Sequence, residues 1–131
     1  MPSTRSRTSN EALTDILHNI YLATGFAEGM TYQAFCADIR TVYAVTRCFE
    51  IVSEASRRLP KHLKARHPHI PWTDIAGAGS VYRHSYEDVL ERVLWQTRKH
   101  GLEPLKAVVE EELRRLEVEW SEAPLPRPAL T

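Results

Sequence analysis

Apolar residues recur every three or four positions along most of the chain, which is the spacing of one face of an α-helix. After Asn10 they stand at Leu13, Ile16, Leu17, Ile20, Tyr21 and Phe26. Asn10 is a favourable helix N-cap, and Gly29 is typical of the residue that closes a helix. The pattern predicts a first helix that begins at residue 10 and ends before Gly29.

A second apolar stripe predicts a long helix. Thr31 is an N-cap candidate and leads through a short turn to Phe35, and the stripe then runs through Ile39, Val42, Val45 or Thr46, Phe49, Val52 and Ser56. Pro60 either ends this helix or opens a new short one. Residues 61–71 are basic, rich in histidine and interrupted by two prolines, so we expect a connector.

The second half of the chain predicts three further helices. The first starts near Trp72, with Thr73 or Asp74 as its cap, and continues to about Tyr86. It contains a run of small residues at 76–80, which is typical of a close approach by another backbone or a ligand. The next helix begins at Glu87 or Asp88 and is capped by Gly101, and the last runs from about Pro104 through Leu116. No stretch indicates a strand, so the pattern predicts an all-α, antiparallel helical bundle.

Length and composition indicate one domain. The chain has 131 residues, of which 43% are hydrophobic and 26% charged, as in an ordinary globular protein. We expect a flexible N-terminus at 1–9, a helical domain at 10–118 and a Pro-rich disordered tail at 119–131. Apolar leader and bilayer-length segments are missing from the sequence, which favours a cytoplasmic protein without a membrane partner. Cys36 and Cys48 lie in apolar-periodic segments and are interpreted as reduced core thiols.

Several kinds of functional site are disfavoured by the sequence. The net charge is zero, so contact with RNA requires a local basic patch, and DNA is not an expected partner. No zinc-finger spacing or His-Glu-x-x-His motif is present, and His67 and His69 lie in a Lys/Arg-rich loop where solvation is the simpler reading. No phosphate-binding glycine loop, Gly-x-Ser-x-Gly elbow or base-paired cysteine is present either. We therefore expect neither a metal nor a cofactor.

The segment from Ser80 to Asp88 holds the remaining candidate chemistry. On a regular helix, Ser80, His84 and Asp88 would lie one above another at four-residue spacing. Asp88 would then orient the ring of His84, the side-chain type that titrates nearest neutral pH. This arrangement holds only if the helix stays regular as far as Asp88.

Two neighbours extend this candidate site. Arg83 carries a fixed positive charge suited to phosphate, and Tyr86 brings a hydroxyl group. With His84 transferring a proton and Arg83 stabilising the developing charge, the segment fits a phosphodiester-cleaving site. The alternative is an exposed helix end, in which Arg83 pairs with Glu87 and the histidine is simply hydrogen-bonded.

The order of several short motifs resembles the HepT-like branch of the HEPN superfamily over residues 10–116. The matching pieces are Asp15-Ile16-Leu17, Phe35, Ile51-Val52-Ser53-Glu54-Ala55, Ile70-Pro71-Trp72, Ile75-Ala76-Gly77, His84-x-Tyr86, Val93 and Trp95. Each piece is weak alone, whereas their order and spacing together are specific.

This resemblance implies a HEPN-like bundle that forms a homodimer, with motifs from both protomers meeting in one cleft. It also implies a metal-independent ribonuclease toxin whose substrate is RNA and whose partner is a minimal nucleotidyltransferase antitoxin. Members of the family place the catalytic histidine at the position of His84. The antitoxin adenylylates the tyrosine two residues later, which corresponds to Tyr86.

One family residue is missing from this sequence. The family motif has an arginine four to six residues before the histidine, usually followed by asparagine, but Gly79 and Ser80 occupy those places here. Arg83 lies one helical turn after Gly79, and helical side chains lean toward the N-terminus. We therefore expect Arg83 to reach over Gly79 and take the place of the missing group. The alternative is a non-catalytic HEPN interaction domain that binds a nucleotidyltransferase partner or RNA.

Overall fold

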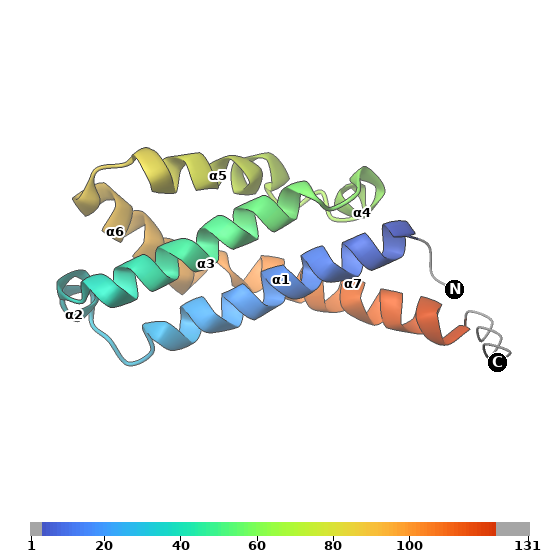
Figure 1. The fold of residues 1–131 in the computed structure, drawn as a ribbon, viewed down its shortest axis with the longest axis horizontal. Coiled ribbons are helices and arrows are strands. Elements are labelled where there is room, and N and C mark those ends of the chain that lie inside the picture. The colour runs from blue at the N-terminus through green and yellow to red at the C-terminus, as the bar shows by residue number, and fades with distance from the viewer. Residues whose placement is uncertain (1–3, 123–131) are drawn as a thin grey trace, which may run out of the picture.

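The computed structural model describes residues 4–122, and this part of the chain is a helical bundle without a strand (Figure 1). It comprises seven α-helices and one π-helical turn: α1 (Thr4–Phe26), α2 (Tyr32–Ala37), α3 (Ile39–Arg57), α4 (Lys61–Ala65), α5 (Trp72–His84), α6 (Glu87–Gln96), the π-helical turn η1 (Thr97–Gly101) and α7 (Glu103–Glu122). The predicted all-α class is confirmed. No helix in the described range has both the length and the apolar character needed to cross a bilayer.

The long helix α3 lies between two others, with α1 packed on one side and α5 on the other, while α7 packs on α1 (Figure 1). The predicted apolar stripes form the core between them. Fully or almost fully buried side chains include Leu13, Ile16, Ile20, Val45, Phe49, Leu94 and Val109. The ends of the stripes face outward, since Tyr21, Phe26 and Ile39 are each about half exposed. Periodicity thus identified the core, although not its limits.

Both ends of the predicted domain differ from the structure. α1 begins at Thr4, so Asn10 lies inside the helix and the predicted cap there is wrong. Ser9 and Ala12 are buried, which shows that tertiary packing continues the helix through this point. At the other end, α7 extends to Glu122 and takes in the start of the predicted tail. Residues 1–3 and 123–131 lie outside the described range.

Predicted turns around α2 are confirmed. Gly29 has a φ of 78°, a left-handed conformation that glycine adopts without strain. The hydroxyl of Thr31 accepts a hydrogen bond from the backbone N–H of Ala34 at 3.1 Å and caps α2. The chain therefore reverses between α1 and α3 over a short, well-defined connection.

The segment from Pro60 to Gly101 confirms one predicted detail and corrects two others. Pro60 is followed by the short helix α4, one of the two roles expected for it, so the predicted connector is partly helical. Helix α5 starts at Trp72 as predicted, but Pro71 occupies its N-cap position rather than Thr73 or Asp74. Gly101 does not cap a helix, because it lies in the π-helical turn that joins α6 to α7. A π-turn changes the direction of the chain without a loop, so no left-handed glycine is required.

Candidate functional site

Small residues in the middle of α5 allow α3 to come close. The hydroxyl of Ser53 donates a hydrogen bond to the carbonyl of Ala76 at 3.0 Å and accepts one from the N–H of Gly79 at 3.1 Å. Arg57 donates to the same Ala76 carbonyl from Nε and Nη2, at 2.9 and 2.6 Å. The close approach predicted for this run is therefore made by side chains of α3.

Arg83 occupies the space beside Gly79. A Cβ atom added at Gly79 would lie 3.5 Å from Nη1 of Arg83 and 3.2 Å from Oγ of Ser53. Nη1 of Arg83 is also 3.8 Å from Oε2 of Glu50, on α3, and 55% of the Arg83 side chain is exposed. The ion pair of Arg83 is thus made with Glu50 and not with Glu87. The predicted reach of Arg83 back to Gly79 is present in the structure.

The predicted stack of Ser80, His84 and Asp88 does not form. Helix α5 ends at His84, and Ser85 is extended, with ψ of 150°. Asp88 therefore belongs to the first turn of α6, on a differently directed helix. Within residues 4–122 no hydrogen bond joins His84 to Ser80 or Asp88. His84 is exposed at the very end of its helix.

Tyr86 is the most exposed large hydrophobic residue described, at 85%. It occupies the N-cap position of α6 but makes no side-chain capping bond. Serine, threonine, aspartate and asparagine are the residues that stabilise a helix from this position. Tyr86 therefore contributes neither packing nor capping to the fold, and its hydroxyl is open to solvent.

Behind α5 lies a small apolar pocket that sequence reasoning did not reveal. Its volume is about 190 Å³, and its walls come from α3, α5, η1 and α7, including Phe49, Ile75, Tyr82 and Leu105. Burial raises the pKa of Tyr82, and a hydrogen bond with Thr97 only partly opposes this, so its phenol stays neutral. Ligand pockets usually measure ~300–1,000 Å³. This pocket is therefore too small for a ligand as large as a nucleotide.

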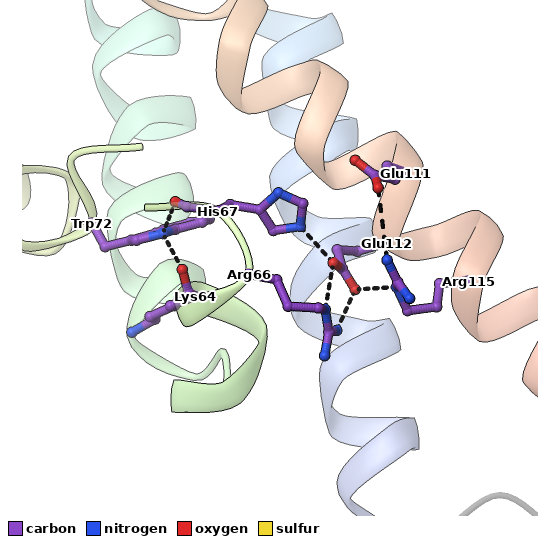
Figure 2. A network of polar contacts seen from close by, with 7 residues as sticks. All are labelled: Lys64, Arg66, His67, Trp72, Glu111, Glu112 and Arg115. Carbon is purple, nitrogen blue, oxygen red and sulfur yellow. Dashed lines mark hydrogen bonds and ion pairs between the residues drawn. The ribbon is translucent and has the colours of Figure 1, made fainter. Parts of the chain in front are cut away.

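A buried ionic cluster around Glu112 was also missed (Figure 2). Arg66 donates two hydrogen bonds to this carboxylate, at 3.1 and 2.6 Å, and Nε2 of His67 lies 2.5 Å from Oε2. Arg115 approaches Oε1 from the same helix at 3.4 Å. The signal was present in the sequence, because Glu112 stands three residues after Val109, on the apolar stripe of α7. The cluster fastens the segment after α4 to α7.

His67 is thereby held inside the fold, so the solvated position expected for it is wrong. Its ring is 93% buried against Glu112, and the rings of His67 and His69 lie 6.1 Å apart, edge to face. No group of three or more His, Cys, Asp or Glu side chains in the described range could hold a metal ion. Cys36 and Cys48 are free, and burial raises the pKa of each thiol, which disfavours a reactive thiolate.

Comparison with known proteins agrees with the family resemblance seen in the sequence. The family profile "Ribonuclease HepT-like" matches residues 16–112. A Thermococcus cleftensis protein named "Probable ribonuclease HepT" is 36% identical over 79% of this chain and 94% of its own length. A Methanocaldococcus jannaschii protein named "Putative RNase" is 31% identical over 80% of this chain and 87% of its own. No solved structure matches significantly.

Both the profile and these relatives span the helices that carry Gly79, Arg83, His84 and Tyr86. The match covers most of the chain, and the bundle is the architecture that the resemblance implied. This chain belongs to the ribonuclease HepT-like family.

Proposed function

We propose that the chain is a cytoplasmic ribonuclease toxin that cleaves RNA without a metal or cofactor and acts as a homodimer. Its activity would be held in check by a minimal nucleotidyltransferase antitoxin. Family membership supports ribonuclease activity in general. The observation that carries the proposal for this chain is the position of Arg83, whose guanidinium fills the space beside Gly79 one residue before His84.

The proposed reaction is an attack by a ribose 2′-hydroxyl on the adjacent phosphorus. His84 accepts the 2′-proton as the 2′-oxygen forms its bond to phosphorus, and the bond to the 5′-oxygen breaks. The leaving 5′-oxygen takes a proton from water or from protonated His84. Arg83 offers its charge to the phosphoryl oxygens as negative charge accumulates on them. The products are a 2′,3′-cyclic phosphate and a 5′-hydroxyl.

Purified variants test the roles of Arg83 and His84. We expect His84→Ala to slow cleavage of single-stranded RNA by at least about 100-fold, as removal of a general base does. Arg83→Ala should slow it by a similar factor, as loss of one charge-stabilising donor does. Arg114→Ala is the matched control, because Arg114 is an exposed arginine on α7. An RNA with a 2′-deoxyribose at the cleavage position should remain intact.

The two variants separate the parts of the proposal. Cleavage that persists in Arg83→Ala but disappears in His84→Ala would show that Arg83 does not replace the missing arginine. Equal cleavage by wild type and His84→Ala would contradict the whole assignment. Absence of cleavage by the wild type would instead favour the alternative, a non-catalytic HEPN domain that binds a nucleotidyltransferase or RNA, for which the glycine at position 79 is the supporting observation.

Tyr86 is the proposed acceptor of an AMP group. Its phenolic oxygen would attack the α-phosphorus of ATP bound to the nucleotidyltransferase, releasing pyrophosphate. Tyr86 is 85% exposed on the short connection after His84, so its hydroxyl is accessible to a partner enzyme and near enough to block the site once modified. Mass spectrometry after co-expression should find one added AMP on the wild type and none on Tyr86→Phe. An unmodified wild type would remove this form of regulation and leave the ribonuclease proposal standing.

A further inference from the structure

Positive charge is concentrated in one segment of this neutral chain. Residues 55–73 contain Arg57, Arg58, Lys61, Lys64 and Arg66 together with three histidines, and no acidic residue. The rest of the chain therefore has 12 basic and 17 acidic residues, a net charge of −5. The neutral total conceals a strong separation of charge.

Part of this charge holds the segment in place. Arg58 pairs with Asp15 of α1 at 2.8 Å, and Arg66 and His67 bind Glu112 of α7. The indole Nε1 of Trp72 donates to the carbonyl of Lys64 at 3.1 Å and to that of His67 at 3.0 Å. The connector between α3 and α5 is thus a firmly anchored part of the fold.

The side chains of Lys61 and Lys64 have no such role, in contrast to Arg57, which donates to the Ala76 carbonyl on α5. Lys61 and Lys64 make no ion pair with any residue from 4 to 122, and neither do the exposed His62 and His69. The side chain of Lys64 points away from the cluster at Glu112 (Figure 2). Two lysines beside several arginines on a short segment repel one another, which disfavours the compact state. Their placement is explained if an anion neutralises them.

We propose that residues 57–69, named here the basic segment, bind the phosphate backbone of single-stranded RNA. Lysine is a flexible point charge, suited to contacts with phosphates and not to reading bases. None of the exposed large hydrophobic residues lies between positions 55 and 73, so the segment lacks the apolar anchors of a protein or membrane interface.

The position of the segment relates it to the proposed active site. It lies at the N-terminal end of α5, and His84 ends the same helix (Figure 1). The 12 steps from Trp72 to His84 span about 18 Å at the α-helical rise per residue. An RNA strand of several nucleotides can contact both ends. The inference that this strand is also the substrate rests on the proposed ribonuclease function. The inference that RNA binds to the basic segment does not depend on that function.

Salt dependence of binding tests the inference directly. The double variant Lys61→Gln/Lys64→Gln is compared with Lys99→Gln/Lys106→Gln, which removes the same charge from η1 and α7. Fluorescence anisotropy measures binding of a labelled single-stranded RNA whose 2′-O-methyl groups prevent cleavage, between 50 and 200 mM salt. Each lost phosphate contact lowers the slope of log affinity against log salt by ~0.7. We expect Lys61→Gln/Lys64→Gln to lower the slope by about 1.4 and the control double variant to leave it unchanged.

An unchanged slope for Lys61→Gln/Lys64→Gln would overturn the inference. An equal fall of the slope for both double variants would also overturn it, because the lower net charge alone would then explain the change. Circular dichroism confirms that both variants fold. Failure of the ribonuclease proposal would give a different result. The wild type would not cleave unmodified RNA, but the slope would still fall for Lys61→Gln/Lys64→Gln. Cleavage with an unchanged slope would reject the segment alone.

Discussion

At the scale of single residues, Glu112 is an acidic side chain buried within an apolar stripe. Burial alone would raise the pKa of its carboxyl, but hydrogen bonds from Arg66 and His67 outweigh burial and lower the pKa below its usual range. A carboxyl whose pKa falls on folding stabilises the native state above its unfolded pKa. That stabilisation is lost as the pH falls through the folded pKa. The cluster therefore makes the protein sensitive to acid.

Glu112→Gln should lower the free energy of unfolding by about 3 kcal/mol at pH 7, because it leaves Arg66 and His67 without their buried partner charge. The Glu112→Gln variant should also lose less stability than the wild type when the pH is lowered from 5 to 3. Urea denaturation across this range measures both effects. Glu111→Gln is the control, since Glu111 is half exposed with only a 3.7 Å pair to Arg115. Equal effects of the two variants would contradict this account.

At the scale of helices, the contact between α3 and α5 sets the environment of the candidate site. Ser53 is hydrogen-bonded to the backbone of α5 at two points, and Gly79 has no side chain to keep it away. The same contact leaves room for the guanidinium of Arg83 beside Gly79. Positions 53 and 79 are therefore coupled, although they lie 26 residues apart in the sequence.

A double-mutant cycle measures this coupling. Gly79→Ala gains up to ~1 kcal/mol of helix propensity, but its Cβ would lie 3.2 Å from the Ser53 hydroxyl. In a Ser53→Ala background the nearest atoms lie at ordinary distances, so Gly79→Ala should be more stabilising there by about 0.5–1 kcal/mol. Urea denaturation of the four proteins gives the coupling energy.

Gly77→Ala is the matched control, because a Cβ at Gly77 would meet no atom within 4 Å. It should stabilise the protein equally in both backgrounds. A coupling energy near zero for Gly79 would mean that Ser53 moves aside at no cost and that the contact between the two helices is not tight.

At the scale of the whole molecule, several apolar side chains remain uncovered. Ile39 and Tyr43 stand one turn apart on α3 and are 52% and 63% exposed. Such a stripe suits the homodimer that we propose, because a two-fold interface brings the same surface together from each protomer. Tyr21 and Val118 are also apolar and about half exposed, so exposure by itself does not identify the dimer interface.

Tyr43→Asp should raise the dissociation constant of the dimer by about 100-fold, because each protomer would bury an unpaired carboxylate. Light scattering coupled to size-exclusion chromatography follows the change from dimer to monomer. Val118→Asp, at a similarly exposed position on α7, should leave the dimer intact. A monomeric wild type, or a dimer unaffected by Tyr43→Asp, would show that this stripe is not the interface.

The sequence by itself determined the helical class and most helix positions, and it supplied the candidate site residues, whose roles stay predictions. Helix periodicity and turn residues such as Gly29 and Thr31 act over a few positions, so they can be read locally. The backward lean of Arg83 toward Gly79 was predictable for the same reason, since both residues belong to one helix. His84 and Tyr86 are predicted site residues because of the motif order alone.

Tertiary structure alone decided which groups meet across helices. The break at Ser85 separates Asp88 from His84, because Asp88 belongs to the first turn of α6. The buried Glu112 cluster joins residues 45 or more positions apart, and the partner of Arg83 is Glu50 rather than the local Glu87. Such contacts depend on the relative positions of whole helices, which periodicity does not encode. Helix geometry places Arg83 one turn after Gly79 on the same face. The packing of α3 against α5 adds Ser53 and Glu50 to the surroundings of the Arg83 guanidinium.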